Sequence, residues 1–218
     1  MIDAVSLVAG EHVLDIGCGS GAFLRQLTRA EAKVAGVDPS AGMLDLARRV
    51  NPEADVRQGG FGLLPWPDAT FDVVVAVNAL QFAGNMVGGL HEAVRVVRPG
   101  GRIGIANWAE ARHNDIEVVE AALGGVADTD EDYRCEGGLE RLFASAGVTL
   151  IDAGVVTVDW HVPDDESLIR GVLSGQPGSR STRSDAAIVR AARPFIVADG
   201  YVLRNAFRFA AGRCPVDP

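Results

Sequence analysis

Residues 13–21 read Val-Leu-Asp-Ile-Gly-Cys-Gly-Ser-Gly, and the fold prediction starts from this stretch. Residues with strand character run into three alternating glycines, and a helical pattern begins at Ala22, so the stretch predicts a tight strand-to-helix turn. Because glycine has no Cβ atom, the backbone at Gly17, Gly19 and Gly21 can adopt dihedral angles closed to other residues and approach a small ligand. The N–H groups that begin the next helix favour an anionic group.

The chain on both sides of this turn alternates between strand and helix patterns. The strand before the turn, His12–Ile16, is apolar apart from Asp15, which is typical of a central strand of a parallel sheet. The further strands expected are Lys33–Val37, Asp55–Gln58, Phe71–Val77 and Arg102–Trp108, and the expected helices are 22–30, 40–50 and 90–97. This alternation predicts a doubly wound, Rossmann-like α/β sheet.

The second half of the sequence is less regular. Helices are expected over 116–123, 139–146, 165–173 and 184–197, and long strands over 148–160 and 201–211. The two long strands could pair antiparallel at one edge of the sheet. An acidic loop is expected over 124–132 and a linker over 175–181, and no boundary is sharper than that linker. We therefore expect residues 1–218 to form a single domain.

Composition limits the class of protein. A chain of 218 residues with 48% hydrophobic residues can bury a full core. No run approaches the roughly 20 apolar residues of a membrane span, and the first residues lack the features of a signal peptide, so we expect a cytoplasmic protein. The formal charge of −9 weighs against a nucleic-acid partner. Cys18, Cys135 and Cys214 are widely spaced, which argues against a disulfide framework and against a metal site.

The glycine turn by itself fits more than one ligand. Gly17, Gly19 and Ala22 satisfy a permissive dinucleotide fingerprint, and Asp38 follows about twenty residues downstream, where it could bind a ribose. A nicotinamide-dependent or flavin-dependent oxidoreductase is therefore one alternative.

Four motifs of the first half resemble, in order and spacing, those of class I S-adenosylmethionine-dependent methyltransferases. They are residues 13–21, Gly36-Val-Asp-Pro-Ser, Leu64-Pro-Trp-Pro-Asp-Ala-Thr-Phe-Asp-Val-Val and Val96-Val-Arg-Pro-Gly-Gly-Arg. The sequence is most similar to the small-molecule branch that includes the ubiquinone and menaquinone biosynthesis methyltransferases. The resemblance implies a seven-stranded sheet, mostly parallel, with an antiparallel C-terminal edge. It also implies S-adenosylmethionine as cofactor, S-adenosylhomocysteine as product, a cofactor-binding half at 11–109 and a substrate-side or lid half at 110–218.

The resemblance also assigns residues to the cofactor. They are Asp15, Gly17, Cys18, Gly19, Gly21, Asp38, Pro39, Met43, Gly60, Phe61 and Asn78. Asp15 is an acid in an apolar strand, which is costly unless it is paired, and the matching acid of the family helps hold the amino-acid portion of the cofactor. A dinucleotide fold normally keeps that position apolar. Asp38 could accept hydrogen bonds from the ribose hydroxyls or instead cap the helix that begins at Ser40. Met43 would pack on the adenine or in the core.

One position departs from the family pattern. The family usually has Gly-Asp-Ala after the third strand, where the Asp accepts a hydrogen bond from the adenine amino group, but here the residues are Gly59-Gly60-Phe61. The backbone of Phe61 could still bind the adenine edge, and its ring or Leu63 could cover a face. We expect weakened but retained affinity for S-adenosylmethionine.

Methyl transfer from a sulfonium needs placement more than acid or base chemistry, so the catalytic residues remain unknown. Asn78, Gln81, Phe82, Asn107 and Trp108 follow the fourth and fifth strands, where open α/β sheets bind ligands. Among them we expect Gln81, Phe82 and Trp108 to contact a small-molecule substrate that is methylated at O, N or C. If a general base is used, the candidates are His113, His161 and Tyr133.

Two further hypotheses concern the whole protein. Only about ten residues precede the first strand, where related enzymes generally carry helices over the cofactor, so we expect the helices within 165–197 to form a lid. This short lead-in and Gly60 also leave open a non-catalytic S-adenosylmethionine-binding protein. A homodimer is open as well.

Overall fold

The computed structural model describes residues 1–124, 133–173 and 181–216. The strands are β1 His12–Ile16, β2 Lys33–Asp38, β3 Asp55–Gln58, β4 Phe71–Val77, β5 Val97–Trp108, β6 Thr149–Val162, β7 Ile196–Val197 and β8 Gly200–Arg213. The helices are α1 Ala22–Arg29, α2 Ala41–Val50, α3 Met86–Val96, α4 Asp115–Ala121, α5 Gly138–Ser145, α6 Asp165–Leu173 and α7 Thr182–Ala191, with 3-10 turns η1 Leu80–Phe82, η2 Ala111–His113 and η3 Arg193–Phe195. Nearly all of the acidic loop and linker expected from the sequence lies outside the described residues.

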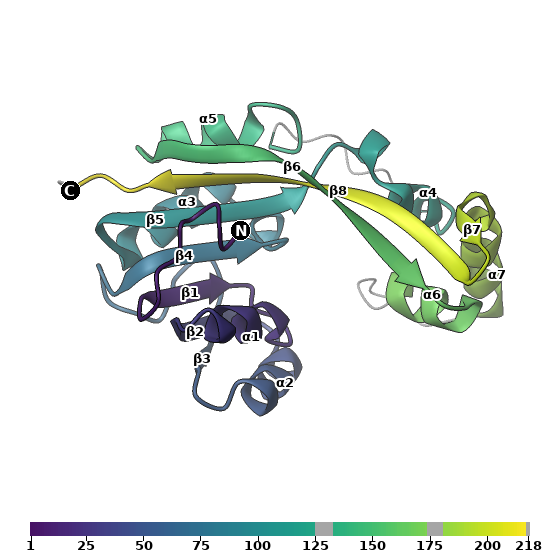
Figure 1. Ribbon diagram of the computed structural model, residues 1–218, viewed down its shortest axis with the longest axis horizontal. Coiled ribbons are helices and arrows are strands. Elements are labelled where there is room, and N and C mark those ends of the chain that lie inside the picture. Colours follow the sequence, from purple (N-terminus) through teal and green to yellow (C-terminus); the bar gives the residue numbers. More distant parts are fainter. Residues whose placement is uncertain (125–132, 174–180, 217–218) are drawn as a thin grey trace. The chain divides into compact units, whose positions relative to one another are not determined.

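The strands form one sheet in the order β3-β2-β1-β4-β5-β8-β6 (Figure 1). The pairs β1–β2, β1–β4, β2–β3 and β4–β5 are parallel. Gly100 donates to Pro215 and Cys214 donates to Gly101, so β8 runs antiparallel to β5. The predicted fold class is confirmed, and the sheet gains one short strand, β7, which pairs with β8.

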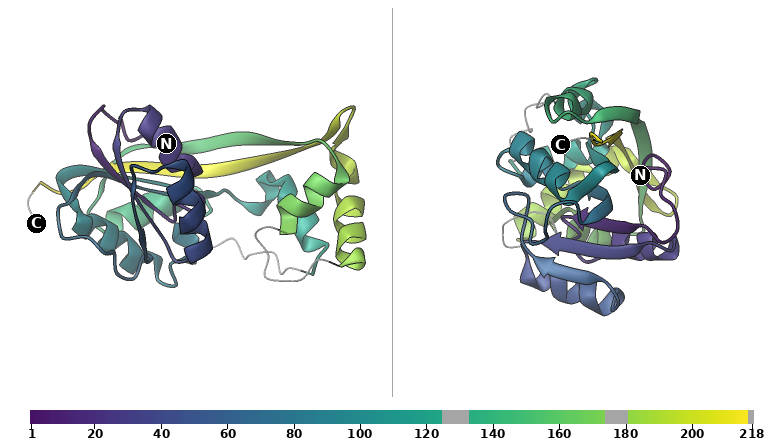
Figure 2. Two further views of the ribbon diagram at one scale, coloured as in Figure 1. Left: turned by 90° about the horizontal axis from the view of Figure 1, so that it is seen from below. Right: turned by 90° about the vertical axis from the view of Figure 1, so that its left-hand side faces the viewer.

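Residues of β1 and β4 alternate between two buried layers. Val13, Val73 and Val75 pack with Leu24 of α1 and with Leu44 of α2. The residues between them, among which Leu14 and Val74 are buried, point to the opposite face, so helices on both sides cover the central strands (Figure 2). The N-terminal segment forms hydrogen-bonded turns, and its Ala4 and Val5 join the core of the first layer.

The chain divides into two compact units. The first comprises 1–107, 136–154 and 208–218, and the second comprises 108–135 and 155–207. The second unit has its own core, formed by α4, α6, α7 and β8, in which Val119, Leu168, Ile188 and Leu203 are fully buried. The single-domain organisation expected from the sequence stays a prediction. Among the described residues, no helix is long and apolar enough to cross a membrane.

The prediction of a helix over 184–197 is wrong beyond Ala191. Arg193–Phe195 forms a 3-10 turn with Pro194 inside it, and Ile196–Val197 forms β7. Proline lacks the N–H group that would continue the helical hydrogen bonds, and the chain instead turns at Asp199-Gly200 into β8. The helix expected from Leu90 begins earlier, at Met86, because the Asn85 side chain accepts a hydrogen bond from Gly88 N–H at 2.9 Å and caps it.

We expect Gly21→Ala to lower the free energy of unfolding by about 2 kcal/mol or more. Gly21 has φ +82°, and an added Cβ would lie 2.5 Å from Asn51 Nδ2 and 2.9 Å from Ala47 Cα. The matched control is Gly42→Ala within α2, where an added Cβ would meet no atom within 4 Å. This control should raise the free energy by about 0.5 to 1 kcal/mol. Urea denaturation of both variants checks the pair, and equal losses would contradict the packing role of Gly21.

Candidate cofactor-binding site

The glycine turn joins β1 to α1 and has a left-handed backbone at each glycine. The φ angles are +76° at Gly17, +52° at Gly19 and +82° at Gly21. The N–H groups of Gly17 and Cys18 both donate to the Val37 carbonyl, at 2.8 and 3.1 Å. An added Cβ at Gly17 would lie 2.4 Å from Ala79 Cβ, whereas one at Gly19 would meet nothing within 4 Å. Gly17 therefore serves packing, and Gly19 borders open space.

The Asp38 carboxylate at the end of β2 binds the backbone on both sides. It accepts hydrogen bonds from Gly19 N–H at 3.0 Å and from Ser40 N–H at 2.9 Å. The N-cap of α2 is Ser40, whose hydroxyl accepts from Met43 N–H at 3.4 Å. A carboxylate offers about four acceptor positions, so two remain after these bonds. Asp38 thus fixes the turn and still has capacity for a ligand.

Asp15 is the buried acid of the site, with 2% of its surface exposed. Among the described residues we find no hydrogen bond to its carboxylate. Burial, and then the negative charge of Asp38, raise the pKa of Asp15 to about 7. A cationic group beside Asp15 would offset both effects, since it would favour the ionised carboxylate.

The residues expected around the adenine differ in exposure. Met43 is 42% exposed and Leu63 is 77% exposed. Phe61 lies against α3, because an added Cβ at Gly89 would lie 3.1 Å from Phe61 Cβ and Cδ1. Gly60 forms an isolated bridge with Leu63, and an added Cβ there would meet nothing within 4 Å. Residue 60, which is usually an Asp in the family that the sequence resembles, therefore has room for an Asp side chain.

Two residues predicted to bind the cofactor, Cys18 and Pro39, could contact a ligand only through their backbone or through the edge of a side chain. The Cys18 side chain is buried beside Gly36 and Leu24, and burial is the first cause that raises the pKa of its thiol to about 12. It is therefore a neutral core thiol. The exposed Pro39 uses its carbonyl to accept a hydrogen bond from Gln58 Nε2 at 3.0 Å.

Amide side chains gather at the ends of β4 and β5. Asn78 has φ +53°, donates its N–H to Ala106 at 2.6 Å and accepts from Gln81 Nε2 at 2.6 Å. Among the described residues, the buried Gln81 Oε1 has no hydrogen-bond partner, and neither does either amide atom of Asn107, which is 1% exposed. Phe82 follows with 80% of its surface exposed. Unpaired buried amides are costly, so these strand ends favour a polar ligand group or ordered water.

The loop after Gly60 is held by residues that the sequence analysis did not identify. Trp66 is buried, donates its indole N–H to Asp55 at 3.0 Å and lies under the Arg57 guanidinium at 4.7 Å. Arg95 donates to the carbonyls of Leu64 and Trp66 at 3.2 and 3.0 Å. The Pro-Trp-Pro-Asp motif marked this loop in the sequence. Its contact residues lie in β3 and α3, and the motif itself does not indicate them.

The second unit contains the four remaining candidates. Trp108 stacks on Phe207 with ring centroids 4.4 Å apart, and Tyr133 is buried. His113 Nε2 accepts from Arg112 Nε at 3.1 Å, and His161 is exposed on β6. Their roles in substrate binding or catalysis stay predictions.

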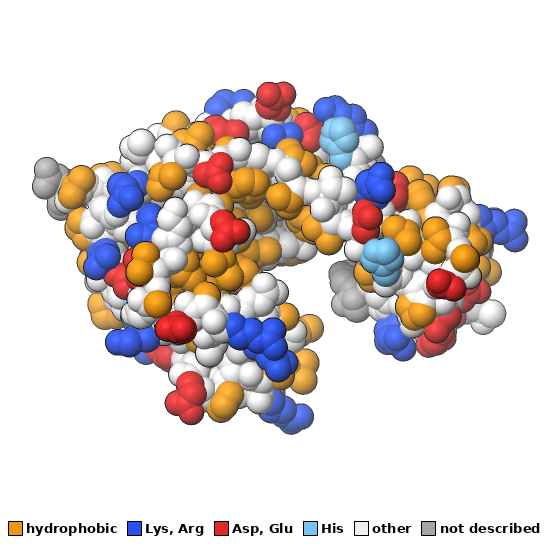
Figure 3. Space-filling model, viewed as in Figure 1, with side chains coloured by type: hydrophobic (Ala, Val, Ile, Leu, Met, Phe, Trp, Pro, Cys, Tyr) orange, Lys and Arg blue, Asp and Glu red, His pale blue; other side chains and the backbone are white. Residues whose placement is uncertain are grey.

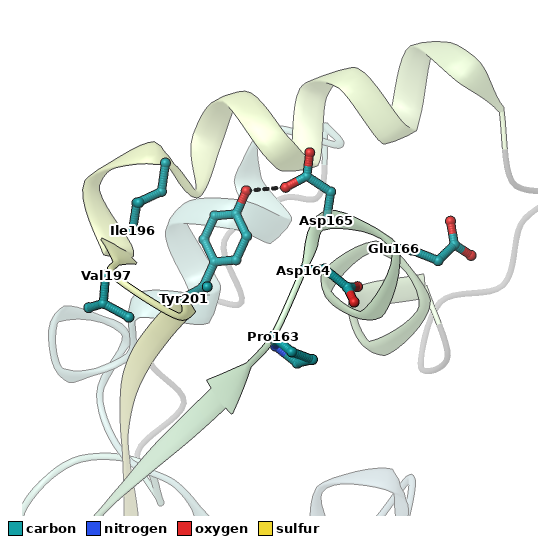
Figure 4. Close-up of a pocket in the computed structure, with 8 residues that line it drawn as sticks. Pro163, Asp164, Asp165, Glu166, Ile196, Val197 and Tyr201 are labelled. Carbon is teal, nitrogen blue, oxygen red and sulfur yellow. Dashed lines mark hydrogen bonds between the residues drawn. The ribbon is translucent and has the colours of Figure 1, made fainter.

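The second unit also holds a pocket of about 440 Å³ between the start of α6 and the β7–β8 hairpin (Figure 4). Asp164, Asp165, Glu166, Ile196, Val197 and Tyr201 line it together with Pro163 and Gly200. Tyr201 donates its hydroxyl to Asp165, and this bond, with partial burial, raises the pKa of Tyr201 to about 12. None of the residues predicted for the cofactor or the substrate lines this pocket.

A doubly wound sheet with a glycine turn after its first strand defines a class of nucleotide-cofactor-binding proteins. Comparison with known proteins makes this class specific. Residues 14–105 match the family described as "Methyltransferase domain". The chain is 30% identical over 185 residues to a probable S-adenosylmethionine-dependent methyltransferase of Mycolicibacterium smegmatis, which covers 76% of this chain and 72% of that protein. The chain therefore belongs to the class I S-adenosylmethionine-dependent methyltransferase family.

Two further similarities agree with this assignment. A demethylmenaquinone methyltransferase of Tropheryma whipplei is 38% identical over 110 residues, which are 50% of this chain and 46% of that protein. The structure of a proposed methyltransferase from Bacillus halodurans C-125 matches the fold with a TM-score of 0.70 at 18% identity, covering 98% of this chain and 96% of that one. The chain spans about half the length of the demethylmenaquinone methyltransferases that it matches. Membership of this family disfavours the alternative of a nicotinamide-dependent or flavin-dependent oxidoreductase.

The raised pKa of Asp15 predicts how stability depends on pH. In the folded protein Asp15 holds its proton up to about pH 7, whereas the unfolded chain releases it near 3.8. The free energy of unfolding therefore contains a contribution that is present below about pH 4 and is lost as pH rises through about 7. Asp15→Asn has no such contribution, so relative to the wild type it should gain about 1 kcal/mol or more between those limits.

Urea denaturation of both proteins across this pH interval checks the prediction. The control is Asp45→Asn, since Asp45 is exposed on α2. Parallel pH profiles for the wild type and Asp15→Asn would contradict a raised pKa at Asp15.

Proposed function

We propose that this protein transfers a methyl group from S-adenosylmethionine to an O, N or C atom of a small-molecule acceptor and releases S-adenosylhomocysteine. The observation that carries the proposal is the buried Asp15 carboxylate, which has no hydrogen-bond partner among the described residues and lies just before the glycine turn. In this family that position is occupied by an acid that helps hold the amino-acid end of the cofactor.

The residues of the first unit fit such a ligand. Asp15 would bind the ammonium group of the amino-acid portion, which would stabilise its ionised form. Asp38 would accept from the ribose hydroxyls with the positions that Gly19 and Ser40 leave free. The open space at Gly19 and at Gly60 allows the backbone to come close to the ligand.

When bound, S-adenosylmethionine supplies a methyl group on a positively charged sulfonium, already activated for displacement. The remaining task of the protein is to orient the acceptor, which is worth about 7 to 11 kcal/mol in favourable model reactions. Gln81 and Asn107 would do so through their unpaired amide groups, and Phe82 would exclude water with its exposed ring. No acid or base is required of the chain unless the acceptor must first lose a proton.

The acceptor class is part of the proposal. The net charge of −9 disfavours nucleic acid, and the face in Figure 3 shows positive and negative side chains interspersed rather than a continuous basic surface. A small molecule is the acceptor that the related methyltransferases support. We also propose a cytoplasmic location, on the sequence features alone.

A second candidate function is a non-catalytic S-adenosylmethionine-binding protein. The observation that favours it is Gly60, which leaves the adenine without the carboxylate that the family usually provides. Both functions require cofactor binding, and they differ only in turnover.

We expect Gly60→Asp to raise the affinity for S-adenosylhomocysteine by about tenfold, because a carboxylate hydrogen bond to the adenine amino group adds about 1.5 kcal/mol. The backbone at Gly60 is not left-handed and an added Cβ has open space, so the fold should tolerate the change. The matched control is Gly62→Asp, since Gly62 lies in the same loop with equal room. Calorimetric titration of both variants checks this, and equal effects would contradict adenine binding at Gly60.

Turnover distinguishes the two candidate functions. We expect purified protein to transfer a labelled methyl group to at least one member of a panel of quinols, phenols, amines and carboxylic acids. Asp15→Asn should weaken S-adenosylhomocysteine binding about tenfold to a hundredfold, whereas Asp45→Asn should not. Binding without transfer to any acceptor would favour the non-catalytic protein, and an absence of binding would refute both candidates.

A further inference from the structure

The loop after β3 lies beside the position where the proposed function places the ribose of the cofactor. In the parallel pair β2–β3, Asp38 is in register with Gln58, and Gly59 N–H donates to the Asp38 carbonyl at 3.2 Å. Open α/β sheets bind ligands at these strand ends. A base attached to a ribose at Asp38 would therefore lie against the loop residues 59–63.

Two carboxylates hydrogen-bond to this loop and its continuation, and both are also bound by an arginine. Glu92 Oε1 accepts from Leu64 N–H at 2.7 Å and from Arg95 at 2.7 Å. Asp55 accepts from the indole N–H of Trp66 at 3.0 Å and forms an ion pair at 2.7 Å with an arginine of its own strand. Both carboxylates therefore hold the protein backbone and side chains in place, and the charge of each is already balanced.

The side chains that the loop offers to a base are small or apolar. An added Cβ at Gly60 or at Gly62 would meet no atom within 4 Å, and Phe61 packs on α3. Leu63 is 77% exposed, and Met43 of α2 is 42% exposed. The hydrophobic effect is not directional, so apolar contacts on the faces of a purine ring do not depend on the group attached to its edge.

We propose that the site binds the purine of the cofactor through its faces and tolerates different groups at the purine C6 position. Ligands of the S-adenosylhomocysteine type then bind about equally well with an amino group, a hydrogen atom or an alkylated amino group at C6. This proposal rests on the proposed function, because it takes the ribose to lie at Asp38.

Gly60 is the residue that determines this specificity. A carboxylate side chain at this position would accept a hydrogen bond from an amino group at C6 and would favour adenine over purines that lack the group. Gly60 provides open space instead, which also leaves room for an alkyl substituent. All three kinds of ligand keep the N1 acceptor of the purine, so a backbone N–H that binds N1 would not distinguish them.

Calorimetric titration of the whole protein with three ligands tests the proposal. They are S-adenosylhomocysteine, its 6-deamino analogue with hydrogen at C6, and its N6-benzyl analogue. We expect the wild type to bind both analogues within about threefold of S-adenosylhomocysteine. Gly60→Asp should bind the 6-deamino analogue about tenfold or more weakly than S-adenosylhomocysteine, because only the latter can donate to the new carboxylate. The matched control, Gly62→Asp, should keep the tolerance of the wild type. Thermal unfolding monitored by circular dichroism verifies that each variant is folded.

Two results would overturn the proposal while leaving the proposed function intact. The first is a wild type that binds S-adenosylhomocysteine more than about threefold more tightly than either analogue, because an acceptor such as Gln58 Oε1 would then bind the amino group. The second is equal discrimination by Gly60→Asp and Gly62→Asp. If the wild type binds none of the three ligands, the proposed function itself is refuted, and the proposal about C6 with it.

Discussion

The hydrogen bonds from Gly19 and Ser40 to the Asp38 carboxylate are the interaction on which the proposed site depends. They tie the turn after β1 to the start of α2, two segments nineteen or more residues apart in sequence. The turn is also held by the Val37 carbonyl, by the Asn51 side chain, which donates to the Gly21 carbonyl at 2.9 Å, and by packing at Gly17 and Gly21. One carboxylate therefore shapes the backbone and, in the proposed function, would accept hydrogen bonds from the hydroxyl groups of a ligand with its remaining acceptor positions.

The second carboxylate, Asp15, bears on the charge of the proposed ligand. Asp15 is buried near Asp38, and the negative charge of Asp38 makes ionisation of Asp15 less favourable. A ligand with a diphosphate would add further negative charge at this turn, whereas a ligand with an ammonium group would relieve the repulsion. The electrostatics of the first unit therefore agree with the family assignment and oppose a dinucleotide, although the glycine pattern by itself fits both.

Sequence reasoning was most accurate where local patterns decide the structure. The bounds of β1, β3, β4 and α6 match the prediction, because short strand-like or helical patterns there end at clear turn signals. The prediction of a helix over 184–197 was wrong at its C-terminal end, although Pro194 is a local signal that a helix stops. The Trp66 contacts with Asp55 and Arg57, and the unpaired amide of Asn107, depend on segments that meet only in the folded chain. No sequence pattern could show them.

The strand ends of the first unit differ in chemistry along the sheet. The ends of β1 and β2 carry the carboxylates of Asp15 and Asp38, whereas the ends of β4 and β5 carry the neutral amides of Asn78 and Asn107. A carboxylate attracts a cation, whereas a neutral amide carries no net charge and offers both a hydrogen-bond donor and an acceptor to a polar ligand group. In the proposed function, the same edge would bind a positively charged cofactor at one end and a polar group of the acceptor at the other. With these roles, one sheet would distinguish the two ligands by the charge of the side chains at its strand ends.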